Sequence, residues 1–72
     1  MTTEAHEPKK PLTQRELDVL VITAKGFSQK EVAGLLSIKQ STVNDRMRSV
    51  FLKLDVNTRV EAAVWAAKKG LV

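Results

Sequence analysis

From residue 12 onward, apolar residues recur at helical spacing, and three apolar runs begin shortly after a hydroxyl residue that has glutamate three positions later. The three matches are Thr13-Gln14-Arg15-Glu16, Ser28-Gln29-Lys30-Glu31 and Thr58-Arg59-Val60-Glu61. In such a capping box, the two side chains bond to backbone N–H groups that the start of a helix leaves unsatisfied. Gly26 and Gly70 suit the left-handed backbone that often ends a helix. The pattern predicts helices over about 14–25, 29–36 and 59–69.

A fourth apolar stripe lies between these elements. Its members recur at i, i+4, i+7 and i+11, and they are Val43, Met47, Val50 and Leu54. This spacing predicts a helix over about 40–54, with Phe51 beside the stripe. The helix lacks a usual N-cap, because Lys39 holds that position. No strand pattern competes, so the prediction is an all-α domain, a four-helix bundle that contains a helix-turn-helix.

The connection between the second and third predicted helices, residues 37–39, is short. A turn of three or four residues between helices forces a sharp angle, as in the helix-turn-helix, whose second helix enters the DNA major groove. Opposite its apolar stripe, the 40–54 helix carries groups that match base edges: Asn for adenine, Arg for guanine and Asp for cytosine. The predicted base-reading residues are Asn44, Asp45 and Arg48.

Hydroxyls and cations on the flank of this helix suit phosphate oxygens. Together with a lysine at the start of the second helix, the predicted phosphate-contacting residues are Lys30, Lys39, Thr42, Arg46 and Lys53. Any exposed helix shows a polar face to water, and Lys30 could equally be an ordinary surface lysine. Asp45 has two interpretations, because phosphates repel a carboxylate: it reads a base, or it orients Arg48 three positions later.

The last predicted helix carries two apolar stripes on opposite sides. Ala62, Trp65 and Ala66 form one, and we expect Trp65 to anchor it in the core. A domain this small cannot cover both sides of its terminal helix. The second stripe is therefore expected to contact a second copy of the chain across a two-fold axis. A slightly apolar exposed helix is the alternative. The predicted dimer residues are Val60, Ala63, Val64 and Ala67.

Composition narrows the possibilities. The chain has 72 residues, a formal net charge of +4, no cysteine and one histidine, His6. These counts exclude a disulfide framework and a Cys/His zinc site. Four cations against one carboxylate give residues 37–54 a net +3, so most of the charge lies on the helix expected to meet DNA.

Residues 1–11 are polar, end in a proline-containing stretch and show no periodicity, so we expect a disordered lead or linker there, followed by one domain over 12–72. No apolar run approaches a membrane span, and no signal peptide is present, which predicts a cytoplasmic protein. A phosphate-binding glycine loop, a catalytic Cys or His and an apolar-flanked carboxylate pair are all missing from the sequence. We therefore expect no enzymatic activity, no cofactor and no metal.

Several blocks, in order, resemble the LuxR/NarL/FixJ type of helix-turn-helix of bacterial transcription regulators. They are Leu12-Thr13-Gln14-Arg15-Glu16, Gly26-Phe27-Ser28-Gln29-Lys30-Glu31-Val32-Ala33, Ser41-Thr42-Val43 and the stretch from Lys53 to Ala63. The resemblance covers about residues 12–72. It implies a four-helix DNA-binding domain in which the third helix reads the major groove and the fourth dimerises. Carried over by position, it assigns base reading, phosphate contact and dimerisation to residues already named above.

The sequence departs from the family pattern at four places. Ser37 stands where glycine is common, and Lys39 where Ser or Thr usually caps the third helix. Arg46 replaces the commonest His, and Asn44-Asp45 replaces a frequent Lys-plus-apolar pair. The target operator therefore cannot be inferred from better-known members. The missing cap also suggests a first turn that adjusts on DNA.

Two functions compete at this point: sequence-specific DNA binding by a dimer in transcriptional regulation, and a protein-interaction module whose basic helix is only solvated. The first predicts double-stranded DNA as partner and a homodimer on DNA, with RNA polymerase as a further candidate partner. It predicts neither a membrane nor a small-molecule ligand for this domain. The chain could be a stand-alone regulator or the output domain of a longer response regulator.

Overall fold

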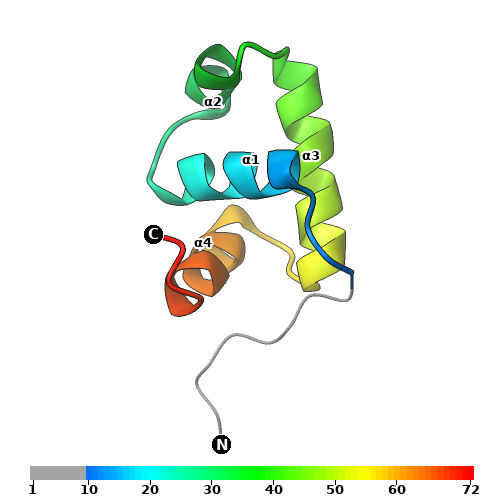
Figure 1. The fold of residues 1–72 in the computed structure, drawn as a ribbon, viewed down its shortest axis with the longest axis vertical. Helices are drawn as coiled ribbons and strands as arrows, with labels where there is room; N and C mark the ends of the chain where they lie inside the picture. The colour runs from blue at the N-terminus through cyan, green and yellow to red at the C-terminus, as the bar shows by residue number, and fades with distance from the viewer. Residues whose placement is uncertain (1–9) are drawn as a thin grey trace, which may run out of the picture.

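Four α-helices follow one another along residues 10–72, the part of the chain that the computed structural model describes (Figure 1). They are α1 (Gln14–Ala24), α2 (Gln29–Leu36), α3 (Gln40–Leu54) and α4 (Arg59–Lys68). No strand occurs within these residues, so the predicted all-α class is confirmed. The predicted bounds of α2 and α3 are confirmed, while α1 and α4 end one residue earlier than predicted. Most of the predicted lead, residues 1–9, lies outside the described residues.

The helix starts confirm two of the three predicted capping boxes. In α1, the Thr13 hydroxyl accepts the N–H of Glu16 at 3.2 Å, and the Glu16 carboxylate accepts the N–H of Thr13 at 2.9 Å. The equivalent pair of bonds starts α2. At α4 the prediction is half wrong, because the Glu61 carboxylate accepts the N–H of Asn57 at 2.9 Å instead of that of Thr58. The φ of Thr58 is −137°, against −73° for Thr13, so the backbone at this cap differs from that of the complete capping box of α1.

The turn between α2 and α3 depends on a left-handed residue. Ser37 has φ 57° and ψ 44°, a region that favours glycine over residues with a Cβ. The N–H of the next residue, Ile38, reaches back to the Ala33 carbonyl at 3.0 Å. The turn therefore closes within three residues and directs α3 sharply away from α2, as the helix-turn-helix prediction requires.

The core lies where α1 packs across the other helices, with α2 above it, α4 below it and α3 along one side in the view of Figure 1. The apolar stripe predicted for α3 is buried, with no member more than 5% exposed. Trp65, Ala62 and Ala66 of α4 are buried too, which confirms the core side predicted for this helix. Of the helices described here, none has both the length and the apolar character needed to cross a membrane.

Candidate nucleic-acid interface

The outer face of α3 carries the residues predicted to read bases. Asn44, Asp45 and Arg48 are all exposed, while the apolar positions next to them in the sequence, Val43 and Met47, are buried. This separation follows from helical periodicity, since about 100° of rotation per residue places the two sets on opposite sides. The exposed residues Asn44, Asp45 and Arg48 leave this face open to a partner. α3 runs along one edge of the fold (Figure 1).

Asp45 and Arg48 are not paired with each other. Within residues 10–72, no ion pair joins them, although other carboxylates and cations of this region do pair. The structure therefore gives no support to the interpretation in which Asp45 orients Arg48. Both side chains keep their hydrogen-bonding capacity for a partner.

Four of the five predicted phosphate-contacting residues lie near this face with accessible polar groups. Lys30 is exposed in the first turn of α2, and Lys39 is exposed at the N-cap of α3. Arg46 is exposed on α3, and Thr42 is half-buried. Lys30, Lys39 and Arg46 thus place exposed cations at the start of α2, at the N-cap of α3 and on α3 itself, which suits contact with phosphates.

The fifth residue, Lys53, has another role in the structure. Its ammonium donates to a Glu16 carboxylate oxygen at 2.7 Å and to the Pro11 carbonyl at 3.2 Å, and its side chain is only 20% exposed. The second carboxylate oxygen of Glu16 accepts the Ser49 hydroxyl at 2.5 Å. The phosphate contact predicted for Lys53 stays a prediction, and it competes with this ion pair.

Glu16 connects α1 to the C-terminal half of α3. The side chain is nearly fully buried, with 5% of the residue exposed. Burial alone would raise its pKa, but hydrogen bonds from Lys53, Ser49 and the Thr13 backbone outweigh burial and lower the pKa from 4.5 to about 2. Glu16 is therefore more than a capping residue, because its charge also fixes where α3 lies on α1.

A small hollow adjoins the face of α3 that carries the base-reading residues. It is lined by Gln29, Asn44, Met47, Arg48, Phe51 and Arg59. The amide nitrogen of Gln29 donates to the Gln40 backbone carbonyl at 3.0 Å, and its amide oxygen accepts from Arg59 at 3.3 Å. Sequence reasoning missed both Gln29 and Arg59, since their partners are 11 and 30 positions away and no local pattern links them.

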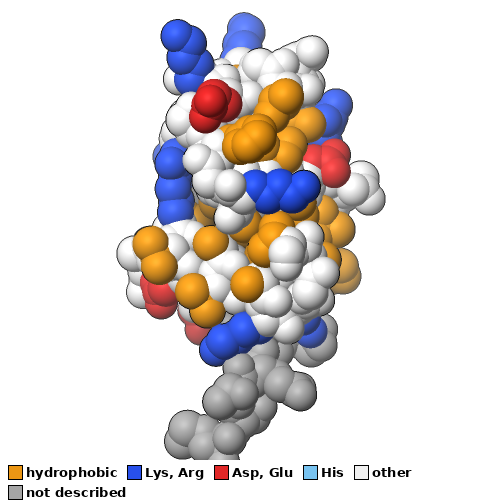
Figure 2. Space-filling view, turned by 90° about the vertical axis from the view of Figure 1, so that its left-hand side faces the viewer, with side chains coloured by type: hydrophobic (Ala, Val, Ile, Leu, Met, Phe, Trp, Pro, Cys, Tyr) orange, Lys and Arg blue, Asp and Glu red, His pale blue; other side chains and the backbone are white. Residues whose placement is uncertain are grey.

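The predicted dimer face of α4 is exposed. Val60 is 72% exposed, Val64 is 46% exposed, Ala67 is also exposed, and Ala63 is half-buried. Figure 2 shows apolar side chains at the surface in both the upper and the lower part of one side of the molecule. α4 thus presents one apolar side to the core and a second to solvent, as its two stripes predicted.

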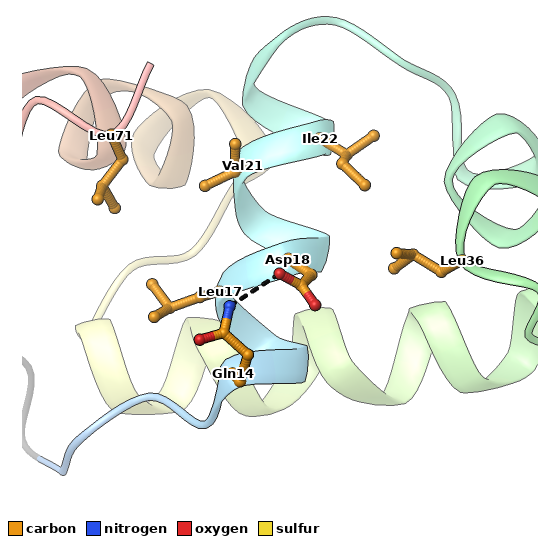
Figure 3. A pocket seen from close by; sticks show the side chains of 7 residues that line it. All are labelled: Gln14, Leu17, Asp18, Val21, Ile22, Leu36 and Leu71. Atoms are coloured by element: carbon orange, nitrogen blue, oxygen red, sulfur yellow. Dashed lines mark hydrogen bonds between the residues drawn. The ribbon is translucent and has the colours of Figure 1, made fainter.

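A separate apolar hollow opens on the side of α1 that faces away from α3 (Figure 3). It is lined by Leu17, Val21, Ile22, Leu36 and Leu71, with Gln14 and Asp18 bonded to each other at 2.9 Å on its rim. Its lining offers a ligand mainly apolar contact. Across residues 10–72, no cluster of His, Cys, Asp or Glu could hold a metal ion.

Two helices joined by a short turn, the second of which exposes amide and guanidinium groups, with exposed cations on both, are typical of a helix-turn-helix domain. Comparison with known sequences agrees. The profile of the family described as "Bacterial regulatory proteins, luxR family" matches residues 10–66. The chain belongs to this family, whose helix-turn-helix is a DNA-binding, non-enzymatic domain of transcription regulators. The DNA-binding interpretation is thereby favoured over the protein-interaction module.

Three relatives illustrate the similarity. The chain is 40% identical over 65 residues to the transcriptional regulatory protein LiaR of Bacillus subtilis. The aligned region covers 90% of this chain and 31% of LiaR. It is 43% identical over 58 residues to the nitrate/nitrite response regulator protein NarP of Escherichia coli, covering 81% of this chain and 27% of NarP. Identity to the transcriptional regulatory protein DesR of Bacillus subtilis is 43% over 60 residues, 83% of this chain and 30% of DesR. The chain spans about a third of the length of these curated relatives.

Proposed function

We propose that the domain binds double-stranded DNA in a sequence-specific manner, with α3 in the major groove. The observation that carries this proposal is the exposure of Asn44, Asp45 and Arg48 on the one side of α3 that the core leaves open. Asn and Arg can each form two hydrogen bonds to adenine and guanine edges, respectively. Lys30, Lys39, Thr42 and Arg46 would then contact phosphates and set the register on the duplex.

The test begins with selection of bound sites from a random DNA pool, which defines the preferred half-site. Arg48→Ala should weaken binding to that site by roughly 1–3 kcal/mol and relax the preference at one base pair. Arg48→Lys is the matched control for charge: it keeps phosphate attraction but loses the planar fork, so the base preference should still relax. Lys30→Ala should instead weaken all sequences alike and reduce the salt dependence. If Arg48→Ala leaves the preference intact, α3 does not read the DNA.

We further propose that the domain dimerises on DNA through the exposed side of α4. The support is the apolar side that Val60, Ala63, Val64 and Ala67 present to solvent, next to a core side that already holds Trp65. A two-fold dimer would place two α3 helices about one DNA turn apart, so the selected sites should contain two half-sites at that spacing.

Val64→Asp tests the dimer, because it places a charge in the proposed contact while the residue stays exposed in the monomer. Leu35→Asp is the matched control, since Leu35 is an exposed apolar residue on α2. Sedimentation of the DNA complexes should show loss of the two-to-one complex for Val64→Asp only. Unfolding of the Val64→Asp monomer would instead place this side chain in the core.

The relatives are named as response regulators and transcriptional regulatory proteins. On that ground we propose that the domain serves transcription regulation in the cytoplasm, with RNA polymerase as a partner at bound promoters. The test measures how much RNA polymerase is retained on promoter DNA bound by the parent domain, compared with the same DNA mixed with the Arg48→Ala variant.

A further inference from the structure

Gln29 is the first residue of α2, yet both of its side-chain bonds leave that helix. The amide nitrogen donates to the backbone carbonyl of Gln40, the first residue of α3, at 3.0 Å. The amide oxygen accepts from the guanidinium of Arg59, the first residue of α4, at 3.3 Å. One side chain therefore joins the starts of three helices.

Few other side-chain hydrogen bonds hold the start of α3 within the described residues. Lys39 occupies the N-cap with no side-chain hydrogen bond, whereas α1, α2 and α4 each start with a hydroxyl cap. The tie between α3 and α1 through Glu16 reaches Ser49 and Lys53, both in the second half of α3. α3 packs directly on α2 and on α1, and only slightly on α4. Within residues 10–72, the Gln29 bonds therefore add a polar tie to the apolar packing that holds the start of α3 beside α2.

This junction lies beside the side chains proposed to read bases. Gln29 and Arg59 line the same hollow as Asn44 and Arg48. Asn44 is four residues after Gln40, one helical turn along the same side of α3. A shift in the first turn of α3 would therefore move Asn44 relative to α2 and α4.

We propose that Gln29 is a positioning residue for DNA recognition, which holds the first turn of α3 at a fixed place relative to α2 and to the start of α4. The bond from Arg59 orients the Gln29 amide so that its nitrogen faces the Gln40 carbonyl. This role rests on the proposed function of α3 as the base-reading helix. It also connects the proposed dimer helix to the reading helix, because α4 begins at Arg59.

The decisive variant is Gln29→Met, which keeps the length of the side chain and removes both its donor and its acceptor. Affinity for the selected site should fall about fivefold to tenfold, as expected for loss of a partly exposed hydrogen-bonded junction. Affinity for a scrambled duplex at the same salt concentration should stay within about twofold, because no charge changes. Hydrogen exchange of the backbone amides of residues 42–44 should become faster.

Gln14→Met is the matched control. Gln14 is the first residue of α1, as Gln29 is of α2, but its side chain bonds only to Asp18 one turn along the same helix. The same chemical change there should leave both affinities and the exchange of residues 42–44 unaltered. If Gln29→Met lowers specific and scrambled affinities in equal proportion, or lowers neither, the positioning role is wrong.

A double-mutant cycle tests the link to Arg59, with the ratio of specific to scrambled affinity as the readout so that the lost charge cancels. Arg59→Met should lower this ratio, and the double variant should show no larger loss than Gln29→Met alone. Additive losses would mean that the two residues act separately and would overturn the link.

Arg48→Ala separates failure of this inference from failure of the proposed function. If Arg48→Ala lowers the ratio while Gln29→Met does not, α3 reads DNA without help from Gln29, and the inference is overturned. If Arg48→Ala leaves the ratio unchanged, base reading by α3 itself is wrong, and the positioning role falls with it.

Discussion

The two halves of α3 are held in contrasting ways. In the C-terminal half, Ser49 and Lys53 both bond to the buried Glu16 carboxylate of α1, and Val50 and Leu54 are fully buried. In the N-terminal half, Val43 and Met47 are also buried and α3 packs on α2, but Lys39 provides no side-chain cap and the side-chain hydrogen bond to α2 comes from the Gln29 amide. Asn44 and Asp45, two of the residues proposed to read bases, lie in this N-terminal half, which lacks a charge pair within residues 10–72.

This difference shows how one helix can be both a part of the core and a recognition surface. A buried charge pair fixes the far end with a defined geometry, since a displaced ammonium would leave a carboxylate unpaired in the interior. The near end, which lacks such a charge pair in the described part of the chain, is held beside α2 by apolar packing and by the Gln29 amide. Four changes to the chain or to the pH separate these contributions.

The largest loss of stability is expected when the Glu16 carboxylate, which holds the C-terminal half of α3, loses its charge. Glu16→Gln retains an acceptor for the Thr13 N–H but leaves the Lys53 ammonium without its buried partner, which should lower the free energy of unfolding by about 3 kcal/mol. Urea denaturation, followed by fluorescence of the single tryptophan, Trp65, measures this. Glu31→Gln is the matched control, because Glu31 forms the same capping box on an exposed helix start. Equal losses in the two variants would show that the Lys53 pair adds nothing.

Acid should remove the same anchor. Because the pKa of Glu16 is lowered to about 2 in the folded state, its contribution is present above the ordinary value of 4.5 and is lost as pH falls toward 2. Between these pH values the protein should lose roughly 2–3 kcal/mol of stability from this group. Urea titrations across this range should show a steeper decline for the parent protein than for Glu16→Gln. Parallel pH profiles would contradict an ionised Glu16 in the fold.

A smaller effect is expected from capping the N-terminal half of α3. Lys39 has φ −75° and ψ 153°, close to the values of the hydroxyl caps Thr13 and Ser28, so a serine there has the backbone geometry to cap α3. Lys39→Ser should be more stable than Lys39→Ala by about 1 kcal/mol, and both variants lose the same charge. Thermal unfolding compares them. Identical melting temperatures would mean that the first turn of α3 cannot use a cap.

The smallest change is expected in the turn that precedes α3. Ser37 has φ 57°, so Ser37→Gly removes a left-handed side chain and should raise the stability by about 0.5 kcal/mol. Ser41→Gly is the control, because the same substitution within the helical first turn of α3 should lower stability by roughly 0.5–1 kcal/mol. A loss of stability in Ser37→Gly would show that the serine side chain supports the turn.

The starts of α1, α2 and α4 were predictable because each is decided within about four residues. Thr13 with Glu16 and Ser28 with Glu31 place α1 and α2, and the apolar stripe of α3 places its buried side. Periodicity also predicted which side of α3 and of α4 is exposed. Even locally the prediction was incomplete, since the Glu61 carboxylate accepts the N–H of Asn57 and not that of Thr58.

What escaped prediction depends on distances between helices. Lys53 lies 37 positions from Glu16, and its place on the flank of α3 suggested a solvent-exposed cation. Spacing along the chain gives the side of a helix on which a residue lies, but not which residue of another helix approaches it. The same limit hid Gln29, whose partners become neighbours only after three helices have packed.

The central place of α1 has a consequence for how the protein is made. α1 packs most extensively on α4 and next on α3, the two helices that follow later in the chain (Figure 1). During synthesis the N-terminal segments emerge first, so the apolar side of α1 waits for partners until about residue 66 has left the ribosome. A nascent chain interrupted before Arg59 would keep that side open to chaperones or proteases. Among the four helices described, the one that leaves the ribosome first thus needs the one that leaves it last to complete its packing.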